Sequence, residues 1–142
     1  MEKIHEFAEK NNIDIRYTTL KCSCLSIRFA KDDYCIGIDP NKITSSTDER
    51  VKLIHDIGHC MTDSFYNTHS PCDLKSKHEY KADKWAIKKL LPFKKLKAFM
   101  KQGNEEVWEI AEYFKVTEGF VRKALKFYEN DFLEDKLNEY YQ

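Results

Sequence analysis

His55-Asp56-Ile57-Gly58-His59 places two imidazoles and a carboxylate on adjoining turns of a predicted helix. Residues four apart on a helix lie on the same face, so His55 and His59 can hold one metal ion between them. A carboxylate beside the first histidine can reach a metal-bound water, as in the H-E-x-x-H arrangement of zinc hydrolases. Asp56 shortens that carboxylate by one methylene group. The pentapeptide therefore predicts a zinc-binding helix, and the alternative is a chance pair of histidines on one helix face.

The residues around the pentapeptide indicate that its histidine face is turned inward. An apolar stripe flanks His55 and consists of Val51, Ile54 and Ile57. Gly58 in mid-helix costs about 1 kcal/mol relative to alanine, so we expect another backbone to approach closely there, namely the sheet that borders a metal cleft. Ser46 and Glu49 have capping-box spacing, which predicts that the helix begins at Ser46.

A zinc ion held by two histidines needs at least one further protein ligand, and Glu79 is the best candidate. It lies in a second predicted helix, about residues 76–91, and Asp83 follows one turn later. A carboxylate in that place can accept the second ring N–H of a zinc-bound histidine and fix its orientation. The alternative is that Ser76 and Glu79 form only a capping box. Rival ligands without a partner in register are Cys72, His69 and His78.

Composition and cysteine usage indicate a small cytoplasmic protein that does not enter a membrane. The chain has 142 residues, and a hydrophobic fraction of 42% is ample for a packed core. No apolar run approaches the roughly 18 residues that span a bilayer, and the charged N-terminus lacks a secretory signal's apolar core. Five cysteines form no regular framework, which fits a reducing compartment. We expect Cys22 and Cys24 to be free thiols.

The pattern along the chain predicts an α+β fold in which a small antiparallel sheet packs on a zincin-like helix pair, followed by C-terminal helices. A helix over residues 1–10 precedes alternating runs at 13–17, 25–29 and 34–38, and the turn at 31–33 suggests a hairpin. Residues 1–102 are predicted to form the metallopeptidase-like core. Residues 103–142 are predicted to form a helical extension, resembling a helix-turn-helix, that packs on the core.

The formal net charge is zero, but it is unevenly spread. Residues 75–101 contain ten lysines and two carboxylates, a net of +8, whereas residues 102–142 carry a net of −5. One helical face gathers Lys77, Lys81, Lys84 and Lys88. That face is either simply solvated or a docking surface for an acidic partner. Arg122, Lys123 and Lys126 line the second helix of the helix-turn-helix-like pair, but the acidic surroundings oppose phosphate attraction, so direct nucleic-acid binding is not expected.

Several stretches resemble the ImmA/IrrE family of zinc metallopeptidases. They are Ile54-His55-Asp56-Ile57-Gly58-His59-Cys60, Asp63-Ser64-Phe65-Tyr66-Asn67 and His78-Glu79-Tyr80-Lys81-Ala82-Asp83-Lys84-Trp85-Ala86. Leu90-Leu91-Pro92 and residues 108–117 are also similar, so the likeness runs from about Thr47 to Tyr128. The resemblance implies a metallopeptidase in which His55, His59 and Glu79 bind zinc and position 56 is the general acid/base. The departure is Asp56, where the family pattern has glutamate.

The resemblance also implies a biological setting. Short members of the family are often carried by prophages and integrative elements, and they act on a helix-turn-helix repressor whose removal switches the element on. We therefore expect a site-specific protease, or antirepressor, with that class of protein substrate. The alternative is a catalytically weak or inactive zinc-binding antirepressor that works by protein–protein binding.

The expected reaction depends on the carboxylate at position 56, which takes a proton from water and passes it to the leaving amine. Aspartate is shorter than glutamate by roughly 1.5 Å, and a misplacement of about 1 Å can cost 10²-fold in rate. Asp56→Glu is predicted to raise turnover if the remaining geometry is that of the family, and a large loss would show a site built around aspartate. Candidate donors to the tetrahedral oxyanion are Tyr66, His69 and Tyr17.

Overall fold

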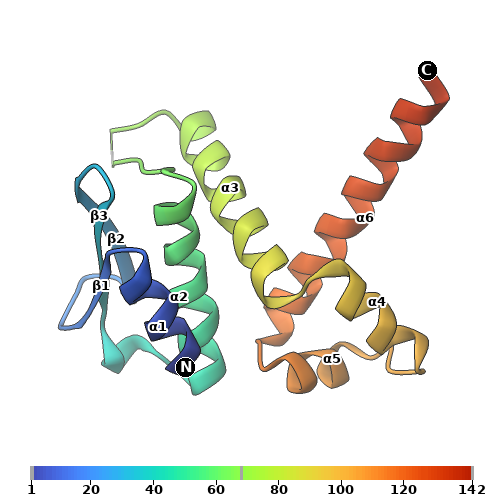
Figure 1. The fold of residues 1–142 in the computed structure, drawn as a ribbon, viewed down its shortest axis with the longest axis horizontal. Helices are drawn as coiled ribbons and strands as arrows, with labels where there is room; N and C mark the ends of the chain where they lie inside the picture. Colours follow the sequence, from blue (N-terminus) through green and yellow to red (C-terminus); the bar gives the residue numbers. More distant parts are fainter. Residues whose placement is uncertain (1, 68, 142) are drawn as a thin grey trace. The chain divides into compact units, whose positions relative to one another are not determined.

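The computed structural model describes residues 2–67 and 69–141, with side chains for 3–67 and 69–132. Backbone contacts divide the chain into two units, residues 1–89 and 90–142. Within the described residues, the fold combines a three-stranded sheet with six α-helices, so the predicted α+β class is confirmed (Figure 1). The elements are α1 (Glu2–Lys10), β1 (Ile13–Tyr17), β2 (Cys24–Ala30), β3 (Asp33–Ile38), the 3-10 helix η1 (Pro40–Lys42), α2 (Ser46–Met61), α3 (Cys72–Leu90), α4 (Phe93–Lys101), α5 (Val107–Phe114) and α6 (Glu118–Tyr141).

The sheet has the strand order β1-β3-β2 and is mixed rather than purely antiparallel as predicted. The β2–β3 hairpin is antiparallel, in agreement with the predicted turn after residue 30. β1, however, pairs with β3 in parallel, with Ile13 opposite Tyr34 and Tyr17 opposite Ile38. The connection over residues 18–23 leads to the far edge of the sheet, so β3 fits between two strands of opposite direction. Strand alternation alone does not specify which strand becomes central.

Helix α2 lies between the sheet and α3, so it is the element that joins the site to the core (Figure 1). Ile36 and Ile38 of β3 are fully buried, as are Leu53 and Ile57 of α2. Each such side chain contributes roughly 1.5–3 kcal/mol by leaving water. This apolar contact fixes one side of α2 and leaves the face with His55 and His59 directed toward α3.

The capping residue of α2 and the start of α3 differ from the sequence-based expectations. Ser45, not Ser46, caps α2: its side-chain oxygen accepts a hydrogen bond from the Asp48 amide at 3.1 Å. Helix α3 begins at Cys72, because Pro71 suits the start of a helix and its carbonyl accepts from the amide of Lys75 at 3.0 Å. Glu79 is therefore inside the helix, which excludes the capping-box alternative.

Gly58 is a point of close approach between α2 and α3. A Cβ atom at this position would lie 2.7 Å from the carbonyl oxygen of Ala82. The prediction that another backbone approaches Gly58 is therefore confirmed. The prediction that this backbone belongs to the sheet is wrong, because it belongs to α3. The glycine lets the two helices approach at the level of the histidines.

The second unit is held together by the apolar side chains of α5 and α6. Ile110, Val121 and Ala124 are fully buried, and Lys115 adopts a left-handed conformation (φ 57°) that ends α5 before α6 begins. The Tyr128 hydroxyl donates to the Leu91 carbonyl at 2.6 Å, tying α6 to the segment before α4. Among the described residues, no helix combines the length and apolar character needed to cross a membrane.

Candidate metal centre

His55, His59 and Glu79 lie together, with one potential ligand atom of each within 4.8 Å of the others. The two histidines are one turn apart on α2, and the glutamate faces them from α3. Glu79 Oε2 lies 2.9 Å from His55 Nε2, and Oε1 lies 3.0 Å from His59 Nε2. Each oxygen of the Glu79 carboxylate thus contacts an Nε2 atom, one on His55 and the other on His59.

His59 is oriented by the turn that follows α2. Asp63 adopts a left-handed conformation (φ 50°), which turns the chain back so that the Ser64 amide donates to the His59 carbonyl at 3.0 Å. His59 Nδ1 lies 2.6 Å from the Ser64 carbonyl oxygen. Because a carbonyl can only accept, Nδ1 carries the hydrogen and Nε2 is the atom that faces Glu79.

His55 is oriented in the same way by a side chain. Its Nδ1 lies 2.9 Å from Asp83 Oδ1, one turn beyond Glu79 on α3. Burial lowers the pKa of His55, but the hydrogen bond and charge of Asp83, together with the charges of Glu79 and Asp56, outweigh it and leave the pKa raised. The carboxylate therefore holds the proton on Nδ1 and directs Nε2 toward Glu79.

Tyr66 completes the contacts of Glu79. Its hydroxyl donates to Glu79 Oε1 at 2.7 Å. Burial raises the pKa of Glu79, but this hydrogen bond and the neighbouring histidines outweigh that effect and lower it. The same hydrogen bond raises the pKa of Tyr66 to about 12. Glu79 is therefore an anion and Tyr66 a neutral donor at neutral pH.

The donor set fits a divalent metal ion. With Nδ1 of each ring bonded to an acceptor, a neutral imidazole directs the lone pair of Nε2 at the anionic Glu79, which is repulsive unless a proton on Nε2 or a metal cation lies between them. The Nε2–oxygen separations of 2.9 and 3.0 Å are slightly below the roughly 3.4 Å expected between tetrahedral zinc ligands about 2.1 Å from the ion. A shift of a few tenths of an ångström would accommodate the ion. Two imidazoles and one carboxylate are a donor set typical of catalytic zinc.

Asp56 lies on the adjacent face of α2, toward the sheet. It is buried, and its Oδ2 atom has no hydrogen-bond partner among the described residues. Burial raises its pKa, against the lowering effects of a hydrogen bond with the Cys24 thiol and of the neighbouring histidines. A buried carboxylate oxygen without a partner, beside a metal-ligand cluster, is costly unless it has a role there.

Comparison with known families agrees with this geometry. The model of the IrrE N-terminal-like domain, a peptidase family, matches residues 8–126. The chain belongs to this family. The match includes the sheet, both helices of the site, α5 and the beginning of α6, and it confirms the ImmA/IrrE resemblance seen in the sequence. No match was found among curated proteins or among solved structures.

Not every candidate residue lies at the cluster of His55, His59 and Glu79. The proposed rival ligands His69, Cys72 and His78 are not members of the described metal-ligand group. The His69 side chain is exposed, and its amide donates to Asn67 Oδ1 at 2.8 Å. The Tyr17 hydroxyl lies 3.1 Å from His5 Nε2 of α1. Of the three candidate oxyanion donors, Tyr66 alone has a described hydrogen bond to the cluster.

Two residues at the site escaped the sequence analysis. Ser64 orients His59 through a backbone carbonyl, which leaves no side-chain signature. Cys24 contacts Asp56 from β2, more than thirty positions earlier in the chain, and only the packing of α2 on β2 reveals it. The single available signal was the inward position of Cys24 on its strand.

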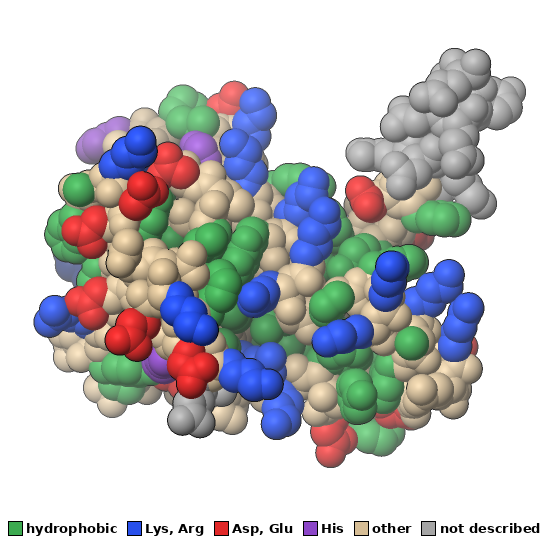
Figure 2. Space-filling view, viewed as in Figure 1, with side chains coloured by type: hydrophobic (Ala, Val, Ile, Leu, Met, Phe, Trp, Pro, Cys, Tyr) green, Lys and Arg blue, Asp and Glu red, His purple; other side chains and the backbone are tan. Residues whose placement is uncertain are grey.

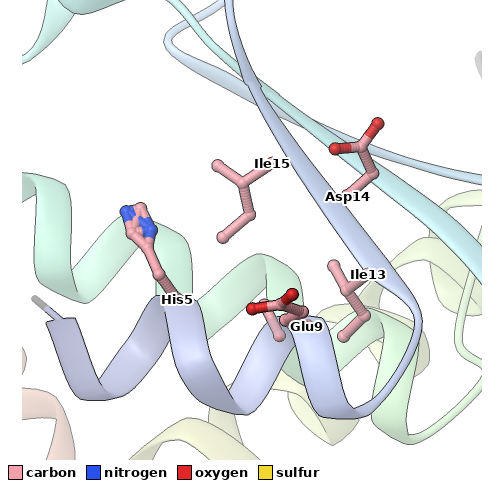
Figure 3. A pocket seen from close by; sticks show the side chains of 6 residues that line it. His5, Glu9, Ile13, Asp14 and Ile15 are labelled. Carbon is pink, nitrogen blue, oxygen red and sulfur yellow. The ribbon is translucent and has the colours of Figure 1, made fainter.

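A pocket of about 410 Å³ lies elsewhere in the first unit, between α1 and β1 (Figure 3). It is lined by His5, Ala8, Glu9, Ile13, Asp14 and Ile15. None of these residues belongs to the metal-ligand group, and Asp14 is paired with Arg16 at 2.7 Å. The pocket is therefore separate from the candidate metal centre.

Proposed function

We propose that this chain is a zinc-dependent peptidase that cleaves a helix-turn-helix repressor of a mobile element. The observation that supports it most directly is the orientation of both imidazoles, each with Nδ1 bonded to an acceptor and Nε2 facing Glu79. His55, His59 and Glu79 are the proposed zinc ligands, and Asp83 orients His55. Membership of a peptidase family supports hydrolysis of a protein, and the repressor target rests on the sequence resemblance alone.

Bound zinc would polarise the scissile carbonyl and lower the pKa of water at the site. In our proposal Asp56 accepts the proton from that water and delivers it to the leaving amine. Its raised pKa favours this exchange, because a general base works best when its pKa is closer to the operating pH. Tyr66 can donate a hydrogen bond to the oxyanion once Glu79 binds the metal, and His69 is a second candidate.

A second candidate function is an antirepressor that binds its partner without cleaving it. Two observations favour it, the short carboxylate at position 56 and the basic surface of α3. Basic side chains gather along this helix in Figure 2, and the members of the predicted stripe, Lys77, Lys81, Lys84 and Lys88, are all exposed. Such a surface can attract an acidic partner through long-range electrostatics.

One experiment separates the two functions. The zinc-loaded protein is incubated with a helix-turn-helix repressor whose gene neighbours its own, and products are identified by mass spectrometry. We expect two fragments from a single cleavage site, and none with Asp56→Asn, which keeps the side chain's size but removes its basicity. Intact repressor in a stable complex with the protein would support the binding function instead.

A further inference from the structure

We propose that the second unit carries a dimerisation surface: an apolar groove between α4 and α6 receives the acidic end of α6 from a second copy of this chain. The groove belongs to residues 90–142, whereas the candidate metal centre belongs to residues 1–89. The inference goes beyond the proposed peptidase function and does not depend on the cleavage of a repressor.

The groove has a volume of about 270 Å³ and lies between two helices of the same unit. Its apolar lining consists of Phe93, Leu96 and Met100 of α4 with Leu125 and Tyr128 of α6. The ring centroids of Phe93 and Tyr128 are 5.2 Å apart, yet Phe93 remains 48% exposed. An apolar groove with a half-exposed phenylalanine is a surface on which an apolar segment can dock.

The apolar face of α6 continues beyond the groove. Its members are spaced by three or four residues and so share one side of the helix: Val121, Leu125, Tyr128 and Phe132. Val121 is fully buried, whereas Phe132, one turn beyond Tyr128, is 56% exposed. The face that is covered at the start of α6 therefore reaches the solvent at Phe132.

The rim of the groove is basic. Lys97 and Lys101 line it, together with one carboxylate, that of Glu105. Helix α4 contains four lysines, all exposed, and no acidic residue, so its side chains carry a net charge of +4. Lys97 Nζ lies 5.9 Å from the centre of the Phe93 ring, which places positive charge close to the apolar lining. We therefore expect the occupant of the groove to be both apolar and acidic.

The second half of α6 has this chemistry. Residues 129–141 contain five carboxylates and one lysine, a net charge of −4, together with one phenylalanine, two leucines and two tyrosines. Helix α6 is continuous from Glu118 to Tyr141, and the family model ends at residue 126. The acidic segment thus follows the part of the chain that matches the family.

The acidic end of α6 cannot reach the groove of its own copy. Leu125 and Tyr128 line the groove, and residues 129–141 continue the same helix for about 20 Å. A continuous helix does not fold back on its own start. In Figure 1 the end of α6 continues past α4 and α5, the other helices of its unit. The basic groove and the acidic end can therefore meet only between two copies.

A two-fold axis lets both copies make this contact at once. Two α6 helices that pack antiparallel, with the axis near Phe132, place the acidic end of each beside the groove of the other. The two exposed phenylalanines then meet at the axis and leave water together. This contact is closed, so it predicts a dimer and not a filament. An acidic segment of another protein would also suit the rim, but it would leave the complementary charge of α6 without a role.

Sedimentation velocity of the full chain, measured with zinc present over a dilution series, tests the dimer. We expect a monomer–dimer equilibrium whose Kd rises with salt, because salt screens charges at a rim. Lys97→Glu combined with Lys101→Glu should raise the Kd by about tenfold or more. Lys94→Glu combined with Lys95→Glu is the matched control, because it reverses the same charge on the same helix at positions that do not line the groove. This control should raise the Kd much less.

A mixing experiment tests whether the occupant is the end of α6. Glu134→Lys combined with Asp135→Lys should weaken the dimer as the groove variant does, because each variant then pairs like charges with itself. An equal mixture of the two variants should form a heterodimer, since both of its contacts again join opposite charges. Circular dichroism of each variant checks that its helical content is unchanged.

Several results would overturn the proposal. They are a monomer at every concentration and salt, a control pair that raises the Kd as much as the groove pair, and a mixture that stays monomeric. A monomer that binds a repressor through Lys97 and Lys101 would also overturn it, by placing a different protein in the groove. The sedimentation experiments require no cleavage, so the peptidase proposal stands or falls separately.

Discussion

The two helix pairs of this protein differ in the side chains that lie between their helices, which are polar in one pair and apolar in the other. The α2–α3 pair encloses polar side chains, and both histidines, Glu79 and Asp83 have described partners within the pair or its adjoining loop. The α5–α6 pair is joined by apolar side chains such as Ile110 and Val121, and no charged side chain is buried in the part of the pair that the structure describes up to residue 132.

From this contrast we expect metal binding and folding stability to depend on different helix pairs. Burying polar groups contributes little net stability, because each hydrogen bond replaces one made with water. Burying apolar groups contributes roughly 25 cal/mol per Å². We therefore expect substitutions in α2–α3 to act mainly on metal binding and those in α5–α6 mainly on folding.

The largest expected effect is the loss of metal binding in His59→Ala. Removing one of three protein ligands leaves an incomplete site, so we expect stoichiometric zinc in the unchanged protein and almost none in the variant, measured by atomic emission after dialysis. The melting temperature of the metal-free protein should change much less than that of the zinc-loaded protein. Equal zinc content in both proteins would refute the ligand assignment.

Ile110→Ala tests the expectation that substitutions in α5–α6 affect folding and not metal binding. This side chain is fully buried in α5, and its truncation should lower the free energy of unfolding by about 2–5 kcal/mol. Chemical denaturation measures the loss, and zinc titration of the folded variant should give the affinity of the unchanged protein. A marked loss of zinc affinity would show that the two helix pairs are not independent.

Gly58→Ala tests the one place where packing and metal binding should be coupled. The added methyl group meets the Ala82 carbonyl at 2.7 Å, so α2 and α3 must separate. We expect a loss of about 1–3 kcal/mol in unfolding free energy, typical of overpacking, together with weaker zinc binding. Gly119→Ala is the matched control, because a Cβ there meets nothing within 4 Å. Unchanged zinc affinity in Gly58→Ala would contradict the coupling.

The same contrast explains what the sequence could predict. Helical spacing was sufficient to predict that His55 and His59 share a face, because their relation is local. Glu79 and Asp83 could be proposed for the same reason, since their one-turn spacing repeats that of the histidines. Whether α3 would bring them to α2 was a question of tertiary packing, and Gly58 was the only local sign of it.

The remaining features depend on contacts between distant residues. The parallel pairing of β1 with β3 follows from the path of residues 18–23, which no alternation pattern encodes. The Ser64 carbonyl that orients His59 belongs to the backbone, so the type of side chain at position 64 could not predict it. The contact between Cys24 and Asp56 requires the register of β2 on α2, which only the folded chain supplies.

The smallest effect is expected from Asp83→Asn, which retains the shape of the side chain but weakens its hold on His55. Loss of such an orienting carboxylate typically lowers metal affinity 10- to 100-fold, so isothermal titration should show weaker but stoichiometric zinc binding. Unchanged affinity would mean that Asp83 has no influence on the ligand.

The metal-free protein offers an independent measurement of the same interaction. Asp83 and Glu79 raise the pKa of folded His55, so protonation of His55 stabilises the folded state, fully below its unfolded pKa near 6.5. That stabilisation is lost as the pH rises through the raised folded pKa. Asp83→Asn removes the principal source of the shift, so its deficit in unfolding free energy should be larger at pH 6 than at pH 9. A deficit that is the same at both pH values would show that Asp83 does not act on the charge of His55.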